Sequence, residues 1–159
     1  QLTGKLRGAI DALPDHDEAL AESLAKGDGI VGFAVERGNA EAAAEPRLPN
    51  QKVRFVWSGE PQTRWLHTFT GAVTSLPALE AAAKGSGALT FVPDGDGVVR
   101  RVPLVLQIGA TPVSTLAAEA LRVGQGARNI ILKSAGHASG LQEMKIGART
   151  MPPTPQGEV

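Results

Sequence analysis

The sequence of 159 residues contains no cysteine and no tyrosine, and it has only four phenylalanines and two tryptophans. Without cysteine the chain can form no disulfide, no thiol nucleophile and no Cys-ligated zinc site. The scarcity of aromatic side chains argues against a platform on which nucleic-acid bases stack. These absences exclude several classes of enzyme and of nucleic-acid-binding protein, and they leave the cellular compartment open.

An excess of charge and a long apolar run are also missing. Sixteen Lys and Arg residues balance sixteen Asp and Glu residues, so no net charge attracts a nucleic acid or an acidic membrane. No stretch reaches the roughly 18 apolar residues that a transmembrane helix needs, so a membrane is expected to be reached only through segments outside this chain. With 42% hydrophobic residues, residues 1–159 are expected to form a single domain.

Helix and strand patterns alternate along the chain. Helices are expected at residues 14–26, 76–87 and 113–124. Strands are expected at 30–36, 53–57, 88–92 and 98–108, at "NIILK" and, more weakly, at "LQEMKIGART". This alternation predicts an α/β fold with a layered mixed sheet flanked by helices. Since no strand precedes the first helix, the chain is interpreted as an incomplete fragment that lacks the amino-terminal strand and helix.

Two of the expected helices begin with a polar residue that can cap the free N–H groups. Asp15 is expected to cap the first helix and Ser114 the last. In the last helix, Leu116, Ala120 and Leu121 lie at the spacing of one face and are expected to point into the core.

The segment "PDGDGVVRR", residues 93–101, holds a dense group of charged residues. Asp-Gly is typical of hairpin turns, and Gly97 is expected to hold positive φ at the second turn position. "DGDG" also resembles the start of a calcium loop. The twelfth position from Asp94 is Val105, however, where such a loop needs a bidentate Glu. A turn is therefore favoured over a cation site.

Arg100 and Arg101 are adjacent, so on a strand their side chains point to opposite faces. Both faces carry apolar residues, and a guanidinium group near buried surface needs an anionic partner. Asp94 and Asp96 are the nearest acids. One arginine is thus expected to lock the turn and the other to bind an anionic ligand. Arg101 is assigned the structural role and Arg100 the free one.

A second candidate is "TRWLHTFTG", residues 63–71. Trp65, His67 and Phe69 alternate, so they would share one face of an extended strand. Such a triplet forms either core packing or the wall of a ligand pocket. Trp65 and His67 are kept as candidate ligand-binding residues beside Arg100 and Arg101.

Catalytic and cofactor motifs are not found. There is no G-x-S-x-G elbow and no P-loop, and the three histidines, His16, His67 and His137, lack the spacing of a helical zinc site. "GDGIVG" has the letters of a dinucleotide fingerprint, but it follows a helix and enters a strand, the reverse of the order required. We expect no catalytic residue, no metal and no cofactor.

The Asp–Arg segment and the helix pattern after it resemble the second class of CHASE domain (cyclases/histidine kinases associated sensory extracellular). In that family an Asp-x-Asp-Gly turn leads into an Arg-Arg-x-Pro-Leu strand and a helix that often reads Ser-Leu-Ala-x-Glu-Ala. The matching residues are Asp94, Asp96, Gly97, Arg100, Arg101, Pro103, Leu104, Ser114, Leu116, Ala117, Glu119 and Ala120. "DEALAESLAKGDGIVGFAV" is similar to the family's helix and Val-Gly-Phe strand.

The carboxy-terminal segment "MKIGARTMPPTPQGEV" is similar to the family's closing pattern, an Ile-Pro-Thr-Asp-x-x-Gly sequence. Pro155 stands where the family has Asp, so any function of that acid is lost here. The resemblance covers residues 15–159. The family's first strand and helix, which follow a membrane anchor, are not recognisable.

The resemblance implies a ligand-sensing or signal-transmitting module on the extracytoplasmic, periplasmic side of a bacterial cell membrane. A nucleotide cyclase, histidine kinase or Ser/Thr kinase output would lie outside this chain, which itself would not be an enzyme. The implied partners are an unknown small molecule or ion and a second copy in a homodimeric receptor. Two alternatives remain open: an oligomerisation module that uses the edge of "VRFVW" (53–57), and a hydrolase or transferase built from Asp94, Asp96 and His67.

Overall fold

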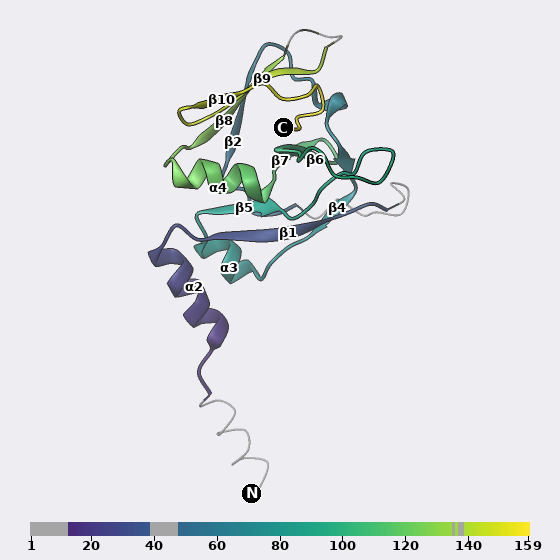
Figure 1. Cartoon of the computed structure of the whole chain (residues 1–159). Helices are drawn as coiled ribbons and strands as arrows, with labels where there is room; N and C mark the ends of the chain where they lie inside the picture. The colour runs from purple at the N-terminus through teal and green to yellow at the C-terminus, as the bar shows by residue number, and fades with distance from the viewer. Residues whose placement is uncertain (1–12, 39–47, 135, 137–138) are drawn as a thin grey trace, which may run out of the picture.

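The computed structural model describes residues 13–38, 48–134, 136 and 139–159. Its helices are α2 (His16–Lys26), η1 (Thr63–Trp65), α3 (Pro77–Ala82) and α4 (Leu116–Gly124). Its strands are β1 (Ile30–Glu36), β2 (Arg54–Ser58), β3 (Thr68–Phe69), β4 (Gly71–Val73), β5 (Gly85–Ala88), β6 (Val105–Ile108), β7 (Thr111–Ser114), β8 (Asn129–Ser134), β9 (Leu141–Ile146) and β10 (Arg149–Met151). The expected α/β fold with mixed sheets is confirmed (Figure 1).

The strands form three small sheets. Their orders are β10-β9-β8-β2, β4-β1-β5 and β3-β6-β7. β2 runs parallel to β8, and β5 runs parallel to β1, while β4, β7, β9 and β10 pair in antiparallel fashion. A bridge between Ala88 and Thr115 joins the end of β5 to the chain just after β7, so the two three-stranded sheets are neighbours.

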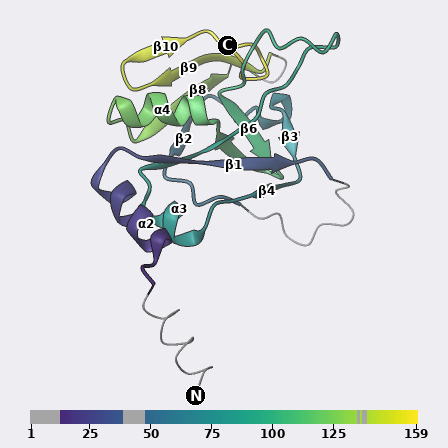
Figure 2. The ribbon, with the colours of Figure 1, turned by 60° about the horizontal axis from the view of Figure 1, so that its bottom comes forward.

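Helix α4 is the central layer. It lies between the β10-β9-β8-β2 sheet and strands β1 and β5, and the two views agree on this (Figures 1 and 2). Helices α2 and α3 lie against each other on the other side of β1. The amino ends of the parallel strands β2, β8 and β5 therefore come close to α3 and to the carboxy end of α4.

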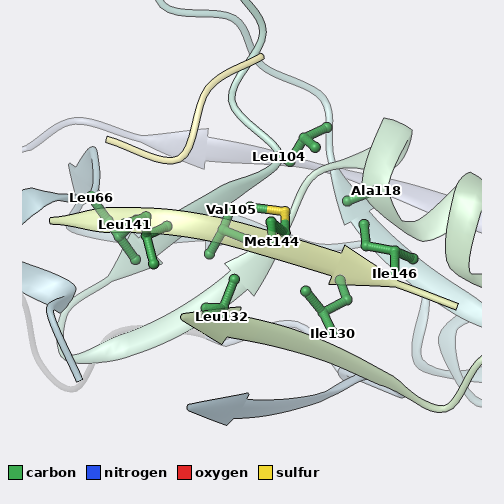
Figure 3. Packing of buried hydrophobic residues seen from close by; sticks show 9 residues of the cluster. All are labelled: Leu66, Leu104, Val105, Ala118, Ile130, Leu132, Leu141, Met144 and Ile146. Atoms are coloured by element: carbon green, nitrogen blue, oxygen red, sulfur yellow. The ribbon is translucent and has the colours of Figure 1, made fainter. Parts of the chain in front are cut away.

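Two apolar clusters hold these layers together. The larger one packs β8 and β9 against α4 and the start of β6, and its members include Ile130, Leu132, Met144 and Ile146, which are fully buried (Figure 3). The smaller one joins β1, β3, β6 and β7 around Phe33. Each buried aliphatic or aromatic side chain contributes about 1.5–3 kcal/mol relative to its exposed state, so these clusters dominate the stability of the fold.

The first helix begins where the sequence predicts. The Asp15 carboxylate accepts hydrogen bonds from the backbone N–H groups of Asp17 and Glu18 at 3.0 and 3.1 Å, which caps α2. None of its residues is buried, and Leu20 is 49% exposed. The helix is held instead by contacts with α3. The described helices include none with the length and apolar character of a membrane span.

Helix α4 differs from the sequence prediction in its N-cap residue and in which of its side chains are buried. Ser114 is the last residue of β7, and the N-cap position belongs to Thr115. Ala120 is exposed, whereas Glu119 and Arg122 are buried. The apolar periodicity was only partly informative. Leu121 packs against the larger core cluster and Leu116 is partly buried, but the buried positions of the helix also include the ion pair of Glu119 and Arg122.

The expected helix at 76–87 is too long, because α3 ends at Ala82 and residues 85–88 form β5. A Cβ atom on Gly87 would lie 2.6 Å from the backbone N and Cα of Leu116. A strand of small residues is needed here because the amino end of α4 packs directly on it. The expected strand at 88–92 is therefore wrong beyond Ala88.

The expected strand at 98–108 is also shorter than predicted. Only β6 is regular, since residues 98–102 belong to an exposed hairpin. The predicted strands at 53–57, at "NIILK" and at "LQEMKIGART" are confirmed as β2, β8 and the β9–β10 pair. The single domain and the missing amino-terminal strand and helix stay predictions.

Candidate ligand-binding site

The Asp–Gly segment forms a tight turn. Gly97 N–H donates to Asp94 O at 2.8 Å, and Asp94 N–H donates to Val98 O at 3.0 Å. Gly97 has a φ of +81°, the left-handed conformation that glycine adopts without strain. The expected positive φ is confirmed, but Gly97 is the fourth turn residue rather than the second central one.

Arg100 locks this turn. Its Nη1 donates to Asp94 Oδ2 and Asp96 Oδ1 at 2.9 Å each, and its Nη2 donates to Asp96 Oδ2 at 2.7 Å. Arg100 Nη1 also lies in an ion pair with Asp94, whereas Arg101 Nη1 stays 3.8 Å from Asp94 Oδ1. The hydrogen bonds from Arg100 and from the Val98 N–H lower the pKa of Asp96, and Asp96 and Asp94 in turn raise the pKa of Arg100.

The assignment of the two arginines is therefore wrong: Arg100 is the lock and Arg101 is the freer side chain. Burial is wrong as well, because both guanidinium side chains are 51% exposed. The expectation assumed that Val98, Val99 and Val102 face a core, but each of them is at least 40% exposed. The hairpin extends past the edge of the sheets, so neither face of it is covered.

Trp65 and His67 do not share a strand face with Phe69. Trp65 ends the 3-10 helix η1, and β3 begins only at Thr68. His67 Nε2 lies 2.8 Å from Glu158 Oε1, in a pair whose side chains are 25% and 13% exposed. Phe69 is buried in the smaller core cluster. The triplet is a packing and anchoring feature, and none of its members lines either groove described below.

The larger of these two grooves lies elsewhere, at the amino ends of β2, β8 and β5. This basic groove has a volume of about 830 Å³. It is lined by Ala25, Lys52, Arg54, Ala81, Ala82, Ala83, Lys84, Arg122, Arg128 and Asn129. Half of these residues are Lys or Arg, and no Asp or Glu is among them. The groove is the candidate ligand-binding site.

Strand topology brings these cations together. Arg54 opens β2, and Arg128 directly precedes β8, its parallel neighbour. Arg54 N–H donates to Arg128 O at 3.3 Å. Lys84 precedes β5, and its N–H donates to Gly29 O at 2.8 Å. Because the amino ends of parallel strands meet at one edge, residues far apart in sequence converge on the groove.

The floor of the groove contains a buried ion pair. Glu119 Oε1 accepts hydrogen bonds from Ser114 Oγ and Arg122 Nε at 3.0 Å each, and Glu119 Oε2 accepts one from Arg122 Nη2 at 2.7 Å. Arg122 also donates to Lys84 O and Ala127 O at 2.9 Å each. The pair is 0% and 7% exposed. Arg122 is thereby neutralised and ties α4 to the start of β5.

The other cations of the groove have no such partner. Lys52 Nζ donates to Ala81 O, near the carboxy end of α3, at 3.4 Å. The side chains of Arg54, Lys84 and Arg128 make no hydrogen bond or ion pair with any described residue. The groove therefore holds several cationic side chains that have no acidic partner among the described residues, next to the buried pair of Glu119 and Arg122.

The comparisons with known proteins agree with the resemblance carried by the sequence. The family model of the CHASE2 domain matches residues 5–158. The chain belongs to the CHASE2 domain family. No curated protein and no solved structure matched it. CHASE2 domains are sensory extracellular domains of receptors, in agreement with the sensory role that the sequence suggests.

The helix motif of the CHASE2 resemblance corresponds to the buried network. Ser114 and Glu119, two of its matching residues, are the hydrogen-bonded pair beneath the groove. The Asp–Arg turn, the more conspicuous part of the motif, lies on the exposed hairpin instead. In this CHASE2 domain the helix motif supports the groove, while the turn motif shapes a projection.

The closing segment of this CHASE2 domain completes the fold. Val102 and Val159 exchange backbone hydrogen bonds at 2.9 and 3.1 Å, and Gly157 O accepts from Leu104 N–H at 2.9 Å. Gly157 has a φ of +84°, and a Cβ atom there would come within 3.2 Å of Leu66. Pro155 is exposed and its carbonyl accepts from Leu141 N–H. The missing acid is thus replaced by a residue with a backbone role.

The third reading, a hydrolase, required Asp94, Asp96 and His67 to cooperate. The structure pairs the two aspartates with Arg100 and pairs His67 with Glu158. Among the described residues, no three His, Asp or Glu side chains are grouped to hold a metal ion. His137 lies outside the described residues.

A simple sequence signal could have pointed to the groove: Lys52, Arg54, Lys84 and Arg128 all stand within two residues of the start of a strand.

Proposed function

We propose that this CHASE2 domain is the ligand-sensing, signal-transmitting module on the periplasmic side of a bacterial transmembrane receptor, and that the basic groove is where its ligand binds. The observation that carries the proposal is a set of cations, without acidic partners among the described residues, around a hollow of about 830 Å³. Pockets of this size are typical of small-molecule sites. A nucleotide cyclase, histidine kinase or Ser/Thr kinase outside this chain would receive the signal.

The position of the groove supports a transmitting role. Its walls come from α2, α3, the start of β2, and the loop before β8, which belong to both sides of the α4 layer. A ligand that contacts all of them favours the arrangement in which they are close. Only such a difference in affinity between two arrangements can shift a receptor equilibrium.

The proposal is tested by filling the groove. Ala81 lines it and is exposed on α3, so Ala81→Trp is expected to occupy the hollow without disturbing the core. In the intact receptor this variant should lose its response to the stimulus and keep its basal output. Ala120→Trp, at an exposed position of α4 outside both grooves, is the matched control. A normal response from Ala81→Trp would contradict the proposal.

A second candidate function is oligomerisation, and the exposed apolar residues that precede the hairpin favour it more than the edge of β2 does. Leu89 and Phe91 are 59% and 63% exposed. They border a smaller apolar groove of about 350 Å³ that is also lined by Val102, Leu116 and Ala117. Exposed apolar patches of this kind mark interaction surfaces, and here the partner would be a second copy of the chain.

Sedimentation equilibrium separates this second function from a purely monomeric sensor. A dimer that Phe91→Asp converts to a monomer, with an unchanged melting temperature, supports it. A strict monomer at high concentration would count against it. β2 remains an alternative contact, because among the described residues no strand pairs with its outer edge.

A further inference from the structure

The basic groove gathers four cations, Lys52, Arg54, Lys84 and Arg128, that have no acidic partner among the described residues, and no Asp or Glu lines it. Some cations elsewhere on the described surface have acidic partners, as in Lys26–Glu22, Lys133–Glu143 and Arg100 with its two aspartates. Others, such as Lys145 and Arg149, have no ion pair with a described residue, but neither of them lines the groove. The chain has as many acids as bases, so unpaired cations are not forced by composition. Like charges held close together repel one another, and an anion in the groove removes that cost.

The cations are also arranged around a volume rather than at a point. Arg54 and Arg128 stand side by side at the starts of two neighbouring strands, Lys84 directly precedes β5, and Lys52 reaches toward α3. The guanidinium group is a planar fork that matches carboxylate and phosphate oxygens in pairs, while ammonium groups act as point charges. Two forks and two point charges are suited to more than one anionic group.

Apart from Asn129, the remaining walls are apolar and small. Ala25, Ala81, Ala82 and Ala83 line the groove beside the cations. An inorganic ion would leave these alanines and most of the 830 Å³ uncovered, whereas a carbon skeleton between the charged groups would contact them. Arg122 adds no free charge, because Glu119 and two backbone carbonyls occupy its donors.

We infer that the groove binds a small organic polyanion, a molecule with two or more carboxylate or phosphate groups on a short carbon skeleton. This inference rests on the proposed sensing function and names its ligand class. Arg54 and Arg128 bind the anionic groups as forks, Lys84 and Lys52 complete the charge balance, and the alanines contact the skeleton. Because the contacts are electrostatic and near solvent, affinity falls as ionic strength rises.

Isothermal titration calorimetry on the 159-residue chain tests this with three probes. Citrate represents polycarboxylates, fructose 1,6-bisphosphate represents phosphate esters with two phosphate groups, and triethyl citrate is the neutral counterpart of citrate. We expect at least one of the two anions to bind and triethyl citrate not to bind. Which anion binds more tightly distinguishes a carboxylate ligand from a phosphate one.

Variants then locate the binding. Arg54→Gln and Arg128→Gln each remove one charge-assisted contact and are expected to weaken the affinity roughly 10- to 100-fold. Arg149→Gln makes the same charge change at an exposed position outside the groove and should leave the affinity unchanged. Equal melting temperatures of the three unliganded variants show that the fold is intact.

Three results would overturn the polyanion assignment: no binding by either anion up to about 10 mM, equal binding of triethyl citrate, or equal affinity in Arg54→Gln and the unsubstituted chain. The sensing function fails differently. If a neutral compound binds and Ala81→Trp blocks it, sensing in the groove stands and only the ligand class is wrong. If Ala81→Trp leaves the receptor response intact, the groove is not the sensing site.

Discussion

Two arginine–carboxylate clusters in this CHASE2 domain have similar hydrogen bonds and opposite surroundings. Arg100 binds Asp94 and Asp96 on a hairpin where the charged side chains are 33–54% exposed. Arg122 binds Glu119 in the layer between the sheets, where the pair is 7% and 0% exposed. Water and salt screen the first cluster, whereas the second must be satisfied entirely by protein groups. The comparison teaches that burial, rather than bond length, decides which pair the fold depends on.

The two clusters also differ in their relation to the basic groove. The buried pair fixes α4 against β5 and forms the floor of the basic groove, so it holds the site in shape. The exposed pair shapes a projecting hairpin that contributes no residue to that groove. Breaking each pair in turn therefore should give effects of very different size.

The largest effect is expected from Glu119→Leu. It leaves the Arg122 guanidinium buried with only two carbonyl partners, and removing one partner of a buried pair typically costs about 3–5 kcal/mol. The free energy of unfolding in urea measures this. The double variant Glu119→Met with Arg122→Met removes both charges and should recover much of the loss. Equal stability of the single variant and the unsubstituted chain would show that the pair is not the anchor of α4.

A smaller loss is expected from Gly87→Ala, which sharpens the role of the α4 layer. The added Cβ meets the Leu116 backbone at 2.6 Å, so α4 has to shift, and such overpacking costs about 1–3 kcal/mol. Gly124→Ala, where a Cβ meets nothing within 4 Å, is the control and should be neutral or stabilising. Similar melting temperatures for the two variants would contradict the close approach of α4 and β5.

The half-buried pair of His67 and Glu158 falls between the two arginine clusters. His67→Ala removes a 2.8 Å hydrogen bond to a carboxylate that is 13% exposed, which is expected to cost about 1–2 kcal/mol. His67→Gln keeps a donor in reach and should cost less. Chemical denaturation distinguishes the two, and no loss in either variant would mean that the closing segment is held by its backbone bonds alone.

Arg100→Ala is expected to have the smallest effect on stability, because the turn it locks is exposed on both faces. Arg100 lowers the pKa of Asp96, so its contribution is present above the unfolded pKa of that carboxyl and is lost as the pH falls through the lower folded pKa. In Arg100→Ala, NMR titration should show the pKa of Asp96 returning toward its ordinary value. A severe loss of stability at neutral pH would contradict the exposed hairpin seen here.

The sequence predicted the layered α/β fold because apolar periodicity and turn residues are local signals. It predicted the turn at Asp94 and its Arg–Asp lock for the same reason. It did not reveal which arginine forms the lock. The alternation of side chains along a strand predicts which of them are buried only where the strand is part of a sheet, and residues 98–102 are not. Nor did the sequence reveal the Gly-rich strand β5, since the need for glycine at position 87 comes from Leu116, 29 residues further along the chain.

The groove could not be predicted from local patterns. Lys52, Arg54, Lys84 and Arg128 are scattered over the sequence, and their meeting depends on the parallel pairing of β2 with β8 and of β5 with β1. The sequence pattern favoured the Asp–Arg segment as the ligand-binding site because its charged residues are adjacent in sequence. In the folded chain those charges neutralise one another, while the scattered cations have no acidic partner among the described residues.

Hydrogen–deuterium exchange with and without a bound ligand tests the central claim most directly, since it reports both regions at once. With a polyanion bound, peptides that cover residues 52–54, 81–84 and 128–129 should gain protection, and the hairpin at 94–101 should exchange unchanged. Protection confined to the hairpin, with the groove peptides unaffected, would contradict the account and return the sensing site to the Asp–Arg turn.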